Sequence, residues 1–248
     1  MVSFDLAGKR ALVTGASSAG LGAHFAHVLA EAGAQVTVAA RRADRLAQLV
    51  AELGRDAAAL ALDVADAQGI AQAIGAAGPF DILVNNAGAT ITKPLLDQDA
   101  ADFDAVMNVN LRGAYLVAQE VAKGMIVRGT GGAIVNTASI LGLRQGSHVT
   151  PYAISKAGLI QLTKQFALEL ARYKIRVNAL APGYFVTDLN RDVLESESGA
   201  AMAKRIALRR FGAYDDLDGP LLLLASDAGR YMTGSILTVD GGHMLLSL

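Results

Sequence analysis

The chain has 248 residues, of which 52% are hydrophobic and 18% are charged, so it can bury a large core. This composition excludes the disordered, coiled-coil and collagen-like classes. Its 22 Lys and Arg residues against 23 Asp and Glu give a net charge of −1, which offers no attraction to nucleic acid or to an anionic membrane. No linker rich in Pro, Gly or Ser divides the chain, so we expect residues 1–248 to form one domain.

The chain contains no cysteine, which excludes disulfides, thiolate nucleophiles, cysteine-ligated zinc and iron–sulfur clusters. The histidines are His24, His27, His148 and His243. His24 and His27 lie three residues apart on an apolar predicted helix, and we expect them to have no nearby carboxylate partner. We therefore expect no metal site.

Export and membrane signals are not apparent in the sequence. The segment from Met1 to Arg10 lacks a basic stretch followed by an apolar one, and no run of about 18 apolar residues occurs. We expect a cytoplasmic protein that does not span a membrane.

Seven short apolar runs predict β-strands, at residues 10–14, 35–40, 57–62, 81–85, 133–138, 175–180 and 235–239. Because these runs are almost continuously apolar, both faces of their sheet should be covered. Helices are predicted between them, at residues 21–32, 43–53, about 100–128 as one long helix, and 151–172. This alternation predicts a single-domain α/β Rossmann fold, with a doubly wound, seven-stranded parallel sheet.

Two irregular stretches, residues 140–150 and 183–212, each follow a predicted strand. Ligands of such sheets bind beyond the carboxyl ends of the strands, so we expect the substrate there. The apolar residues of these stretches, which favour an apolar ketone or secondary alcohol, are Ile140, Leu141, Leu143, Val149, Tyr184, Phe185 and Leu189. Gln145 and His148 could meet a polar group, and Arg144 or Arg191 a carboxylate. Residues 183–212 are expected to form a mobile lid.

A glycine-rich turn, Thr14-Gly15-Ala16-Ser17-Ser18-Ala19-Gly20-Leu21-Gly22, leads from the first predicted strand into a helix. Such a turn lets the backbone approach a pyrophosphate, whose charge is stabilised by free amides and the helix dipole. A tight turn without a ligand would leave the same pattern. Asp63-Val64 and Asn85-Asn86-Ala87-Gly88 argue against that alternative, because they follow strands whose ends would converge around a dinucleotide.

These segments occur together with Asn110, Ser139, Tyr152-Ala153-Ile154-Ser155-Lys156, Asn178 and Pro182-Gly183-Tyr184-Phe185-Val186-Thr187. Over essentially its whole length, the chain thereby resembles the short-chain dehydrogenase/reductase family. The resemblance implies a nicotinamide dinucleotide cofactor, bound by Gly15, Ser17, Gly20, Leu21, Gly22, Asp63, Val64, Asn86, Ala87, Gly88, Tyr152, Lys156, Pro182, Gly183 and Thr187. It places Asp63 and Val64 at the adenine and the Pro182–Gly183–Thr187 segment at the nicotinamide carboxamide. A helix N-cap is the alternative role for Asp63.

The chain departs from the family pattern at two places. Gly15 and Gly20 enclose four residues, where the family usually has three, so we expect a small bulge that keeps Gly20 and Gly22 in register with the helix. Ile154 stands where the family generally has a small residue, and it is expected to narrow the pocket or alter the packing behind it.

The end of the second predicted strand bears on the choice of cofactor. An acidic residue there would favour NAD, but the strand ends at Ala40 and is followed by Arg41 and Arg42, whose guanidinium groups suit a 2′-phosphate. A solvated basic surface is the alternative. It is weakened because positive charge is unfavourable at the start of a helix. The resemblance agrees, with Ser17 as the partner serine, so we expect NADP(H) to be preferred and NAD(H) to be possible.

Tyr152 and Lys156 lie four residues apart and therefore on one face of a predicted helix. A nearby ammonium should lower the pKa of the tyrosine and make its hydroxyl a usable acid or base. The resemblance implies that Tyr152 protonates the substrate oxygen, Ser139 hydrogen-bonds it, Lys156 also holds the nicotinamide ribose, and Asn110 positions a water in a proton relay. The predicted catalytic residues are thus Asn110, Ser139, Tyr152 and Lys156.

We therefore predict an NADPH-dependent carbonyl reductase, or ketoreductase, that is reversible as an alcohol dehydrogenase and acts on a small ketone or secondary alcohol. The alternatives are a 3-oxoacyl carrier-protein reductase, an NAD-dependent secondary alcohol dehydrogenase and a non-catalytic nucleotide-binding scaffold. The apolar end of the chain, from Met244 to Leu248, suggests packing against another subunit, and the resemblance implies a homotetramer.

Overall fold

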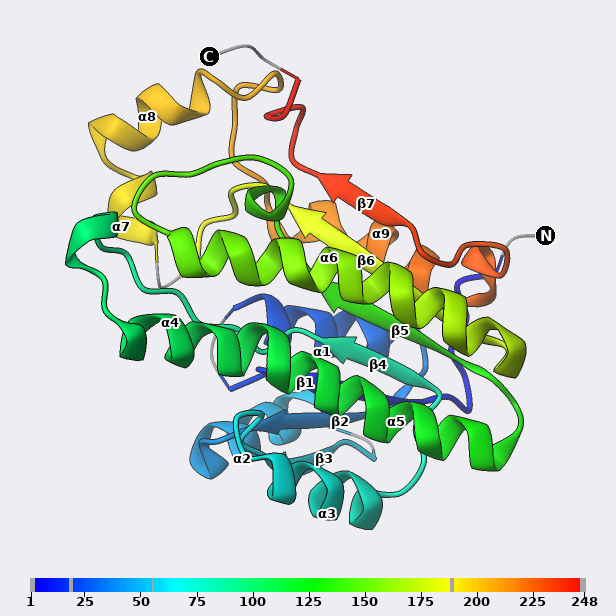
Figure 1. Ribbon diagram of the computed structural model, residues 1–248. Coiled ribbons are helices and arrows are strands. Elements are labelled where there is room, and N and C mark those ends of the chain that lie inside the picture. The colour runs from blue at the N-terminus through cyan, green and yellow to red at the C-terminus, as the bar shows by residue number, and fades with distance from the viewer. Residues whose placement is uncertain (1–2, 18–19, 55, 188–189, 246–248) are drawn as a thin grey trace.

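The computed structural model describes residues 3–17, 20–54, 56–187 and 190–245. Seven strands form one parallel sheet in the order β3-β2-β1-β4-β5-β6-β7 (Figure 1). The strands are β1 (Arg10–Thr14), β2 (Gln35–Ala40), β3 (Ala58–Ala61), β4 (Ile82–Asn85), β5 (Gly132–Thr137), β6 (Ile175–Pro182) and β7 (Ile236–Val239). The chain therefore reverses its direction of winding between β1 and β4, and the predicted doubly wound Rossmann fold is confirmed.

Helices cover both faces of the sheet (Figure 1). One face carries α1 (Leu21–Glu31), α2 (Ala43–Leu53) and α9 (Asp218–Ala225). The other carries α3 (Ala67–Ala77), α5 (Ala114–Arg128) and α6 (Thr150–Leu170), with α4 (Ala100–Met107) leading into α5. Side chains alternate between the two cores: Val13 of β1 faces the first and Leu12 the second, and neither is exposed. Burial of such a side chain contributes roughly 1.5–3 kcal/mol, which explains why the strands are apolar on both faces.

Several predicted boundaries of helices and strands were wrong by one or two residues. The prediction of one long helix was wrong as well, because two α-helices stand in its place. The predicted helix 100–128 is broken by a π-helical stretch, η2 (Asn108–Gly113), between α4 and α5. Its last residue, Gly113, packs so closely on the loop after β3 that a Cβ there would lie 2.5 Å from the Val64 carbonyl oxygen. The wider turn brings the Asn110 side chain inward, where it is 1% exposed.

Helices α3 and α9, which cover the sheet, were not predicted, and neither were the short helices α7 (Arg191–Leu194) and α8 (Glu197–Ala203). Helix α3 contains Gly69 and Gly75, which lower its helix propensity, but Asp66 caps it by accepting a hydrogen bond from the Gln68 amide at 3.1 Å. Helix α9 is eight residues long and largely apolar, so its pattern does not distinguish a helix from a buried strand. The stretch 183–212 is also less irregular than predicted, since it holds α7 and α8.

The carboxyl ends of the strands all point to one edge of the sheet, beside which α7 and α8 lie (Figure 1). The glycine-rich turn, the 3-10 turn η3 (Ile140–Gly142) and the start of α6 come to the same edge. Within the described part of the chain, no helix is long and apolar enough to cross a membrane.

Candidate active site

Tyr152 and Lys156 lie one turn apart in the first turns of α6, as predicted. The Lys156 ammonium is 5.5 Å from the centre of the Tyr152 ring and donates a 2.7 Å hydrogen bond to the Thr137 carbonyl at the end of β5. Lys156 is 4% exposed, and this burial lowers its pKa to about 8. The end of β5 therefore positions the lysine, and burial disfavours the charged form of its side chain.

The prediction that the pKa of Tyr152 is lowered was wrong. Burial raises the pKa of its hydroxyl, and the nearby Tyr184 raises it further, while a hydrogen bond with Ser139 acts in the opposite direction. The reason is that desolvation of the phenolate outweighs the stabilising contacts. Tyr152 is therefore protonated at neutral pH, as a proton donor must be.

Ser139 follows β5 and caps η3, where its hydroxyl oxygen accepts a hydrogen bond from the Leu141 amide at 3.1 Å. Its side chain is also the hydrogen-bond partner of Tyr152. Ser139 and Tyr152, which are thirteen residues apart in sequence, are thus brought together at the sheet edge, as the sequence predicted.

Asn110 ties the loop after β4 to α6. Its Nδ2 donates to the Ala89 carbonyl at 2.9 Å and to the Ser155 hydroxyl at 3.0 Å, and its Oδ1 accepts from the Ala89 amide at 2.7 Å. Ser155 in turn donates to the Tyr152 carbonyl at 2.7 Å. Ser155 was not among the predicted site residues, although it lies inside the Tyr152–Lys156 motif. It connects the predicted catalytic asparagine to the backbone of the predicted catalytic tyrosine.

The glycine-rich turn forms a cradle in which side chains would not fit. Gly15 has a φ of +70°, and a Cβ there would lie 2.7 Å from Ala87 Cα, while a Cβ on Gly22 would lie 2.4 Å from the Gly15 carbonyl oxygen. Gly20 is the N-cap of α1 and has no side chain that could accept from the amides of the first turn. That turn also holds no acidic residue. The residues present therefore fit a pyrophosphate at the start of α1.

Gly20 is the N-cap of α1, which begins at Leu21, and Gly22 lies in its first turn. Of the four residues between Gly15 and Gly20, Ser18 and Ala19 lie outside the described residues, so the expected bulge stays a prediction.

Arg42 reaches across to the glycine-rich turn, with Nη2 donating to the Ser17 carbonyl at 3.1 Å and to its hydroxyl oxygen at 3.3 Å. Arg41 and Arg42 are both exposed at the start of α2, which Arg42 caps without a side-chain bond to the helix. The arginine and the serine named by the sequence for a 2′-phosphate thus contact each other, and their role in cofactor choice stays a prediction. The two side chains offer a cation and a hydroxyl at the turn.

The residues after β3 and β4 also lie at this edge. Asp63 is exposed and Val64 buried beneath it, and an Asp63 oxygen accepts from the Ala65 amide at 2.9 Å. The alternative role of Asp63 as a helix N-cap was wrong, because Asp66 caps α3.

Asn86 follows β4, with its Nδ2 donating to the Thr14 carbonyl at 3.2 Å. The Thr14 hydroxyl accepts from the amides of Asn86 and Ala87 at 3.0 and 3.1 Å. A Cβ on Gly88 would lie 3.7 Å from Asn110 Oδ1 and 3.8 Å from the Lys156 nitrogen. The predicted cofactor segment after β4 thus leads from the glycine-rich turn to the predicted catalytic residues.

The segment after β6 is held by other contacts. Pro182 pairs with Val239 of β7, and the Gly183 amide donates to the Val239 carbonyl at 2.9 Å. The Thr187 hydroxyl donates to Asn190 Oδ1 at 3.1 Å. Asn178 has a structural role, since it donates to the Met232 carbonyl at 2.9 Å and accepts from the Ser235 amide at 3.0 Å.

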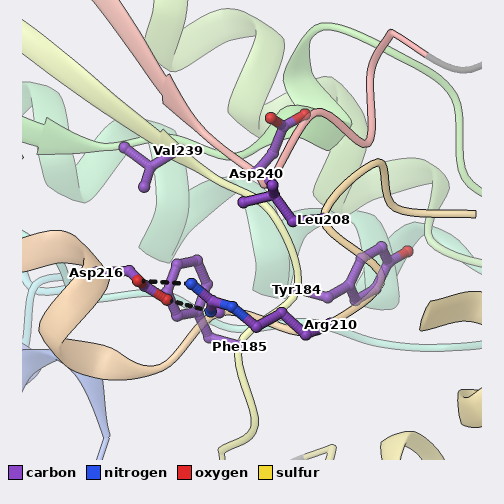
Figure 2. A pocket seen from close by; sticks show the side chains of 9 residues that line it. Tyr184, Phe185, Leu208, Arg210, Asp216, Val239 and Asp240 are labelled. Atoms are coloured by element: carbon purple, nitrogen blue, oxygen red, sulfur yellow. Dashed lines mark hydrogen bonds and ion pairs between the residues drawn. The ribbon is translucent and has the colours of Figure 1, made fainter. Parts of the chain in front are cut away.

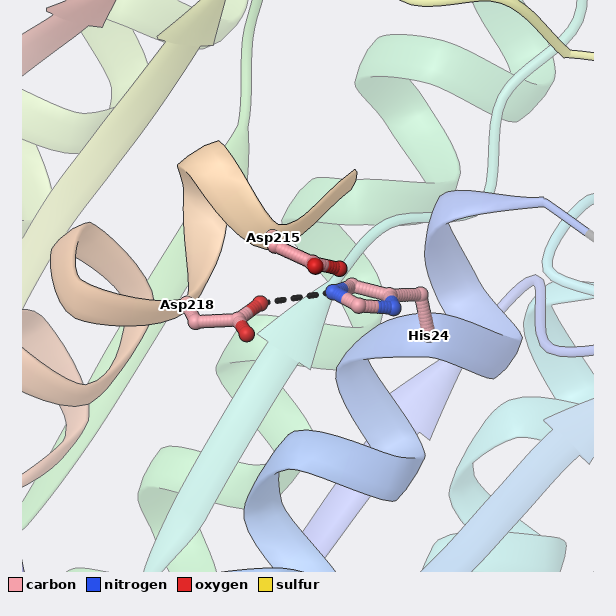
Figure 3. A group of neighbouring side chains, drawn as sticks. All are labelled: His24, Asp215 and Asp218. Atoms are coloured by element: carbon pink, nitrogen blue, oxygen red, sulfur yellow. Dashed lines mark hydrogen bonds and ion pairs between the residues drawn. The ribbon is translucent and has the colours of Figure 1, made fainter. Parts of the chain in front are cut away.

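The expectation that His24 has no nearby carboxylate partner was wrong. In Figure 3 its ring lies between Asp215 and Asp218, which come from the turn before α9 and from α9 itself. His24 Nε2 is 2.6 Å from Asp218 Oδ1, and the possible ligand atoms of all three residues lie within 4.8 Å of one another. The contact spans 194 residues of sequence, so only the packing of α9 on α1 creates it.

Ile154 does not narrow the site, because it is 46% exposed on the outer face of α6. Of the apolar pocket residues predicted, Ile140 is fully buried in the core and Leu143 is exposed, while Leu189 lies outside the described residues. Arg191 pairs with Glu195 at 3.0 Å.

A cavity of about 170 Å³ lies beyond the ends of β6 and β7. Tyr184 and Phe185 line it, as do Arg210 and Asp216, which form a bidentate ion pair at 2.6 and 3.0 Å (Figure 2). A Cβ on Gly212 would lie 2.3 Å from the Phe185 ring, so the segment before α9 is packed directly on the one after β6. The predicted substrate loop therefore does border a cavity, but with a polar lining as well as an apolar one.

Comparison with known proteins agrees with this geometry. A protein-family model described as enoyl-(acyl carrier protein) reductase matches residues 15–244. L-xylulose reductase of Mus musculus is 41% identical over 244 residues, which cover 98% of this chain and 99% of the relative. The chain belongs to the short-chain dehydrogenase/reductase family. It is an oxidoreductase that transfers a hydride between a nicotinamide cofactor and a ketone or secondary alcohol.

Other members of the family are similar over their full length. The 2-dehydro-3-deoxy-D-gluconate 5-dehydrogenase of Escherichia coli is 37% identical and covers 98% of both chains. The crystal structure of a gluconate 5-dehydrogenase from Burkholderia cenocepacia, in complex with NADP and tartrate, has a TM-score of 0.95 at 38% identity and covers 99% of both chains.

Proposed function

We propose that this dehydrogenase/reductase interconverts a hydroxylated ketone and its secondary alcohol, with Tyr152 as the general acid and base. The observation that carries the proposal is the cluster of Ser139, Tyr152 and Lys156, formed where the end of β5 meets the first turns of α6 and fixed by the Lys156 bond to Thr137. The relatives named as sugar reductases and sugar-acid dehydrogenases support a hydroxylated substrate.

In the proposed reaction the bound nicotinamide supplies the hydride to the carbonyl carbon. Tyr152, protonated at neutral pH, gives its proton to the substrate oxygen while Ser139 donates a hydrogen bond to the same oxygen. The phenolate that remains is stabilised by the Lys156 ammonium, 5.5 Å from the ring centre. Asn110 holds Ser155 and hence the backbone of Tyr152, and its part in a proton relay stays a prediction.

The cofactor would extend along the edge from α1 to β6. The proposed contacts are the pyrophosphate at Gly15, Gly20, Leu21 and Gly22, the adenine at Asp63 and Val64, and the nicotinamide half at Asn86, Ala87, Gly88, Lys156, Pro182, Gly183 and Thr187. The glycine cradle supports this assignment, as does Gly20, which caps α1 but has no side chain that could accept from the helix amides.

We further infer a preference for NADP(H) over NAD(H). Ser17 of the glycine-rich turn and Arg42 lie in hydrogen-bond contact, and the preceding residue, Arg41, is a second exposed cation. Positive charge at the start of α2 is unfavourable unless an anion offsets it. A 2′-phosphate is the group that would do so.

The test is calorimetric titration of the purified protein with NADPH and NADH, followed by nicotinamide absorbance with ketoses, keto acids and a 3-oxoacyl thioester. We expect tighter NADPH binding and absorbance decay that depends on the hydroxylated ketone. Decay with the thioester alone would favour the carrier-protein reductase instead. Binding without decay on any substrate would favour a nucleotide-binding scaffold.

A homotetramer is also proposed. An apolar groove lies on the outer face where α4, the π-helical stretch, α5 and α6 meet, and Met107, Leu111, Tyr115, Leu162 and Phe166 contribute to it. Tyr115 in this groove is 41% exposed, and exposed apolar area of this kind favours a subunit contact. Sedimentation would test the assembly, and cell fractionation the predicted cytoplasmic location.

A further inference from the structure

A second polar cluster lies beside the predicted catalytic residues. Arg144, Tyr184 and His243 lie in the segments that follow β5, β6 and β7, which are neighbours in the sheet. Arg144 Nη1 donates to the His243 carbonyl at 2.9 Å, and the rings of Tyr184 and His243 are 5.5 Å apart between centres. Tyr184 lies close enough to Tyr152 to raise the pKa of its hydroxyl. The cluster therefore adjoins the position of the reacting carbonyl.

The cluster has hydrogen-bonding capacity that the protein does not use. His243 is only 7% exposed, yet among the described residues its Nδ1 has no hydrogen-bond partner. Buried polar atoms are nearly always hydrogen-bonded, so an orphan next to an active site points to a ligand.

Arg144 is half-buried, and in the described part of the chain its one hydrogen bond goes to a backbone carbonyl rather than to a carboxylate. The carboxylate of Asp240, near His243, is already engaged by the amides of Gly242 and Met244 at 2.9 and 2.8 Å. The guanidinium therefore retains donors and a positive charge that no described acidic side chain pairs with.

We propose that Arg144, together with His243 and Tyr184, binds a carboxylate of the substrate, which is then a hydroxylated keto acid rather than a neutral ketose. The planar guanidinium matches a carboxylate, and the ring nitrogen and phenol add neutral hydrogen-bonding groups beside it. The inference rests on the proposed function, because it assigns the substrate class of the same site. The relatives include enzymes named for sugar acids and for neutral sugars, so the distinction depends on these residues.

The experiment compares two probes, 5-keto-D-gluconate and L-sorbose, which differ only in a carboxylate against a hydroxymethyl group. The kcat/KM of each would be measured with NADPH for the native protein, Arg144→Gln, Arg144→Lys and Arg230→Gln. Arg230 is an exposed arginine that follows α9 at the opposite edge of the sheet, so its replacement matches the lost charge without touching the cluster.

We expect the native protein to prefer the keto acid, and Arg144→Gln to lower the ratio of the two kcat/KM values by about 10- to 100-fold, mainly through the KM of the acid. Arg144→Lys should restore part of the ratio, and Arg230→Gln should leave it unchanged. The NADPH affinity of each variant reports whether the fold is intact. A merely structural role of Arg144 would lower the activity on both probes equally, and that result would overturn the inference.

The inference and the proposed function fail in different ways. Turnover of L-sorbose without a preference for the acid overturns the carboxylate site and leaves the proposed function standing. Turnover that survives in Tyr152→Phe contradicts the proposed function. If neither probe is reduced, calorimetry of 5-keto-D-gluconate with the NADP-saturated Tyr152→Phe variant decides, because absence of Arg144-dependent binding overturns the inference.

Discussion

Replacement of Arg42 by Ala should weaken the binding of NADPH much more than that of NADH. Arg42 contacts the glycine-rich turn, since its Nη2 lies 3.1 and 3.3 Å from the carbonyl and hydroxyl oxygens of Ser17, where we place the 2′-phosphate of the cofactor. A hydrogen bond between a guanidinium and a phosphate contributes roughly 1.5–3 kcal/mol, so the dissociation constant of NADPH should rise about 10- to 150-fold. NADH has no 2′-phosphate, and its dissociation constant should change less than about threefold.

The assay is calorimetric titration of both nucleotides into the native protein, Arg42→Ala and Arg230→Ala. The control removes the same charge at the far edge of the sheet, so it accounts for the change in long-range field. Equal weakening of NADPH and NADH by Arg42→Ala would refute the assignment of the 2′-phosphate site. So would an Arg230→Ala variant that weakened NADPH as strongly.

Two further predictions concern stability. Lys156→Met should abolish turnover yet raise the free energy of unfolding at pH 7 by up to roughly 3 kcal/mol, because the folded protein lowers the pKa of this buried lysine from 10.5 to about 8. Between pH 8 and pH 10.5 the unfolded native chain binds more protons than the folded one, so the native protein becomes more stable as the pH rises. The difference in free energy of unfolding between Lys156→Met and the native protein should therefore shrink over this range in denaturant titrations; a difference independent of pH would contradict this cause. Gly22→Ala should destabilise the protein by about 1–3 kcal/mol and impair NADPH binding, since its Cβ would lie 2.4 Å from the Gly15 oxygen. Gly75→Ala, with nothing within 4 Å of its Cβ in α3, should instead stabilise it by up to about 1 kcal/mol in thermal unfolding, and a like effect of both substitutions would disprove the close contact.

The sheet could be predicted because most of its strands are buried on both faces, although β3 at one edge is largely exposed. β1 and β2 have the predicted bounds, and each is apolar along most of its length. β6 extends two residues further than predicted, through Ala181 and Pro182. Pro182 stands at the last position of the strand, and the amide of the next residue, Gly183, donates to the Val239 carbonyl of β7 at 2.9 Å, so the pairing does not depend on the missing N–H of the proline.

The division of the long predicted helix could not be read from periodicity. The π-helical stretch at Asn108–Gly113 changes the turn width without interrupting the apolar pattern. It depends on tertiary contacts, namely the Asn110 bonds to Ala89 and Ser155 and the close approach of Gly113 to Val64.

Within the site, residue types and spacing predicted where the chain brings Ser139, Tyr152 and Lys156 together. They did not predict the electrostatics, because the Tyr152 pKa depends on burial and on Tyr184, which follows a different strand. The partners of His24 and His243 could not be predicted either, because Asp218 and Arg144 lie far from these histidines in sequence.

The most direct test of the account compares NADPH oxidation by the native protein and by Tyr152→Phe, at pH 7 and with a hydroxylated ketone as substrate. The substitution removes only the hydroxyl that donates the proton, and the Lys156 bond to Thr137 remains. The account predicts a fall in kcat of about 100-fold or more, with the calorimetric affinity for NADPH within about threefold of the native value. A variant that retained native turnover would contradict the central claim that Tyr152 is the general acid of this enzyme.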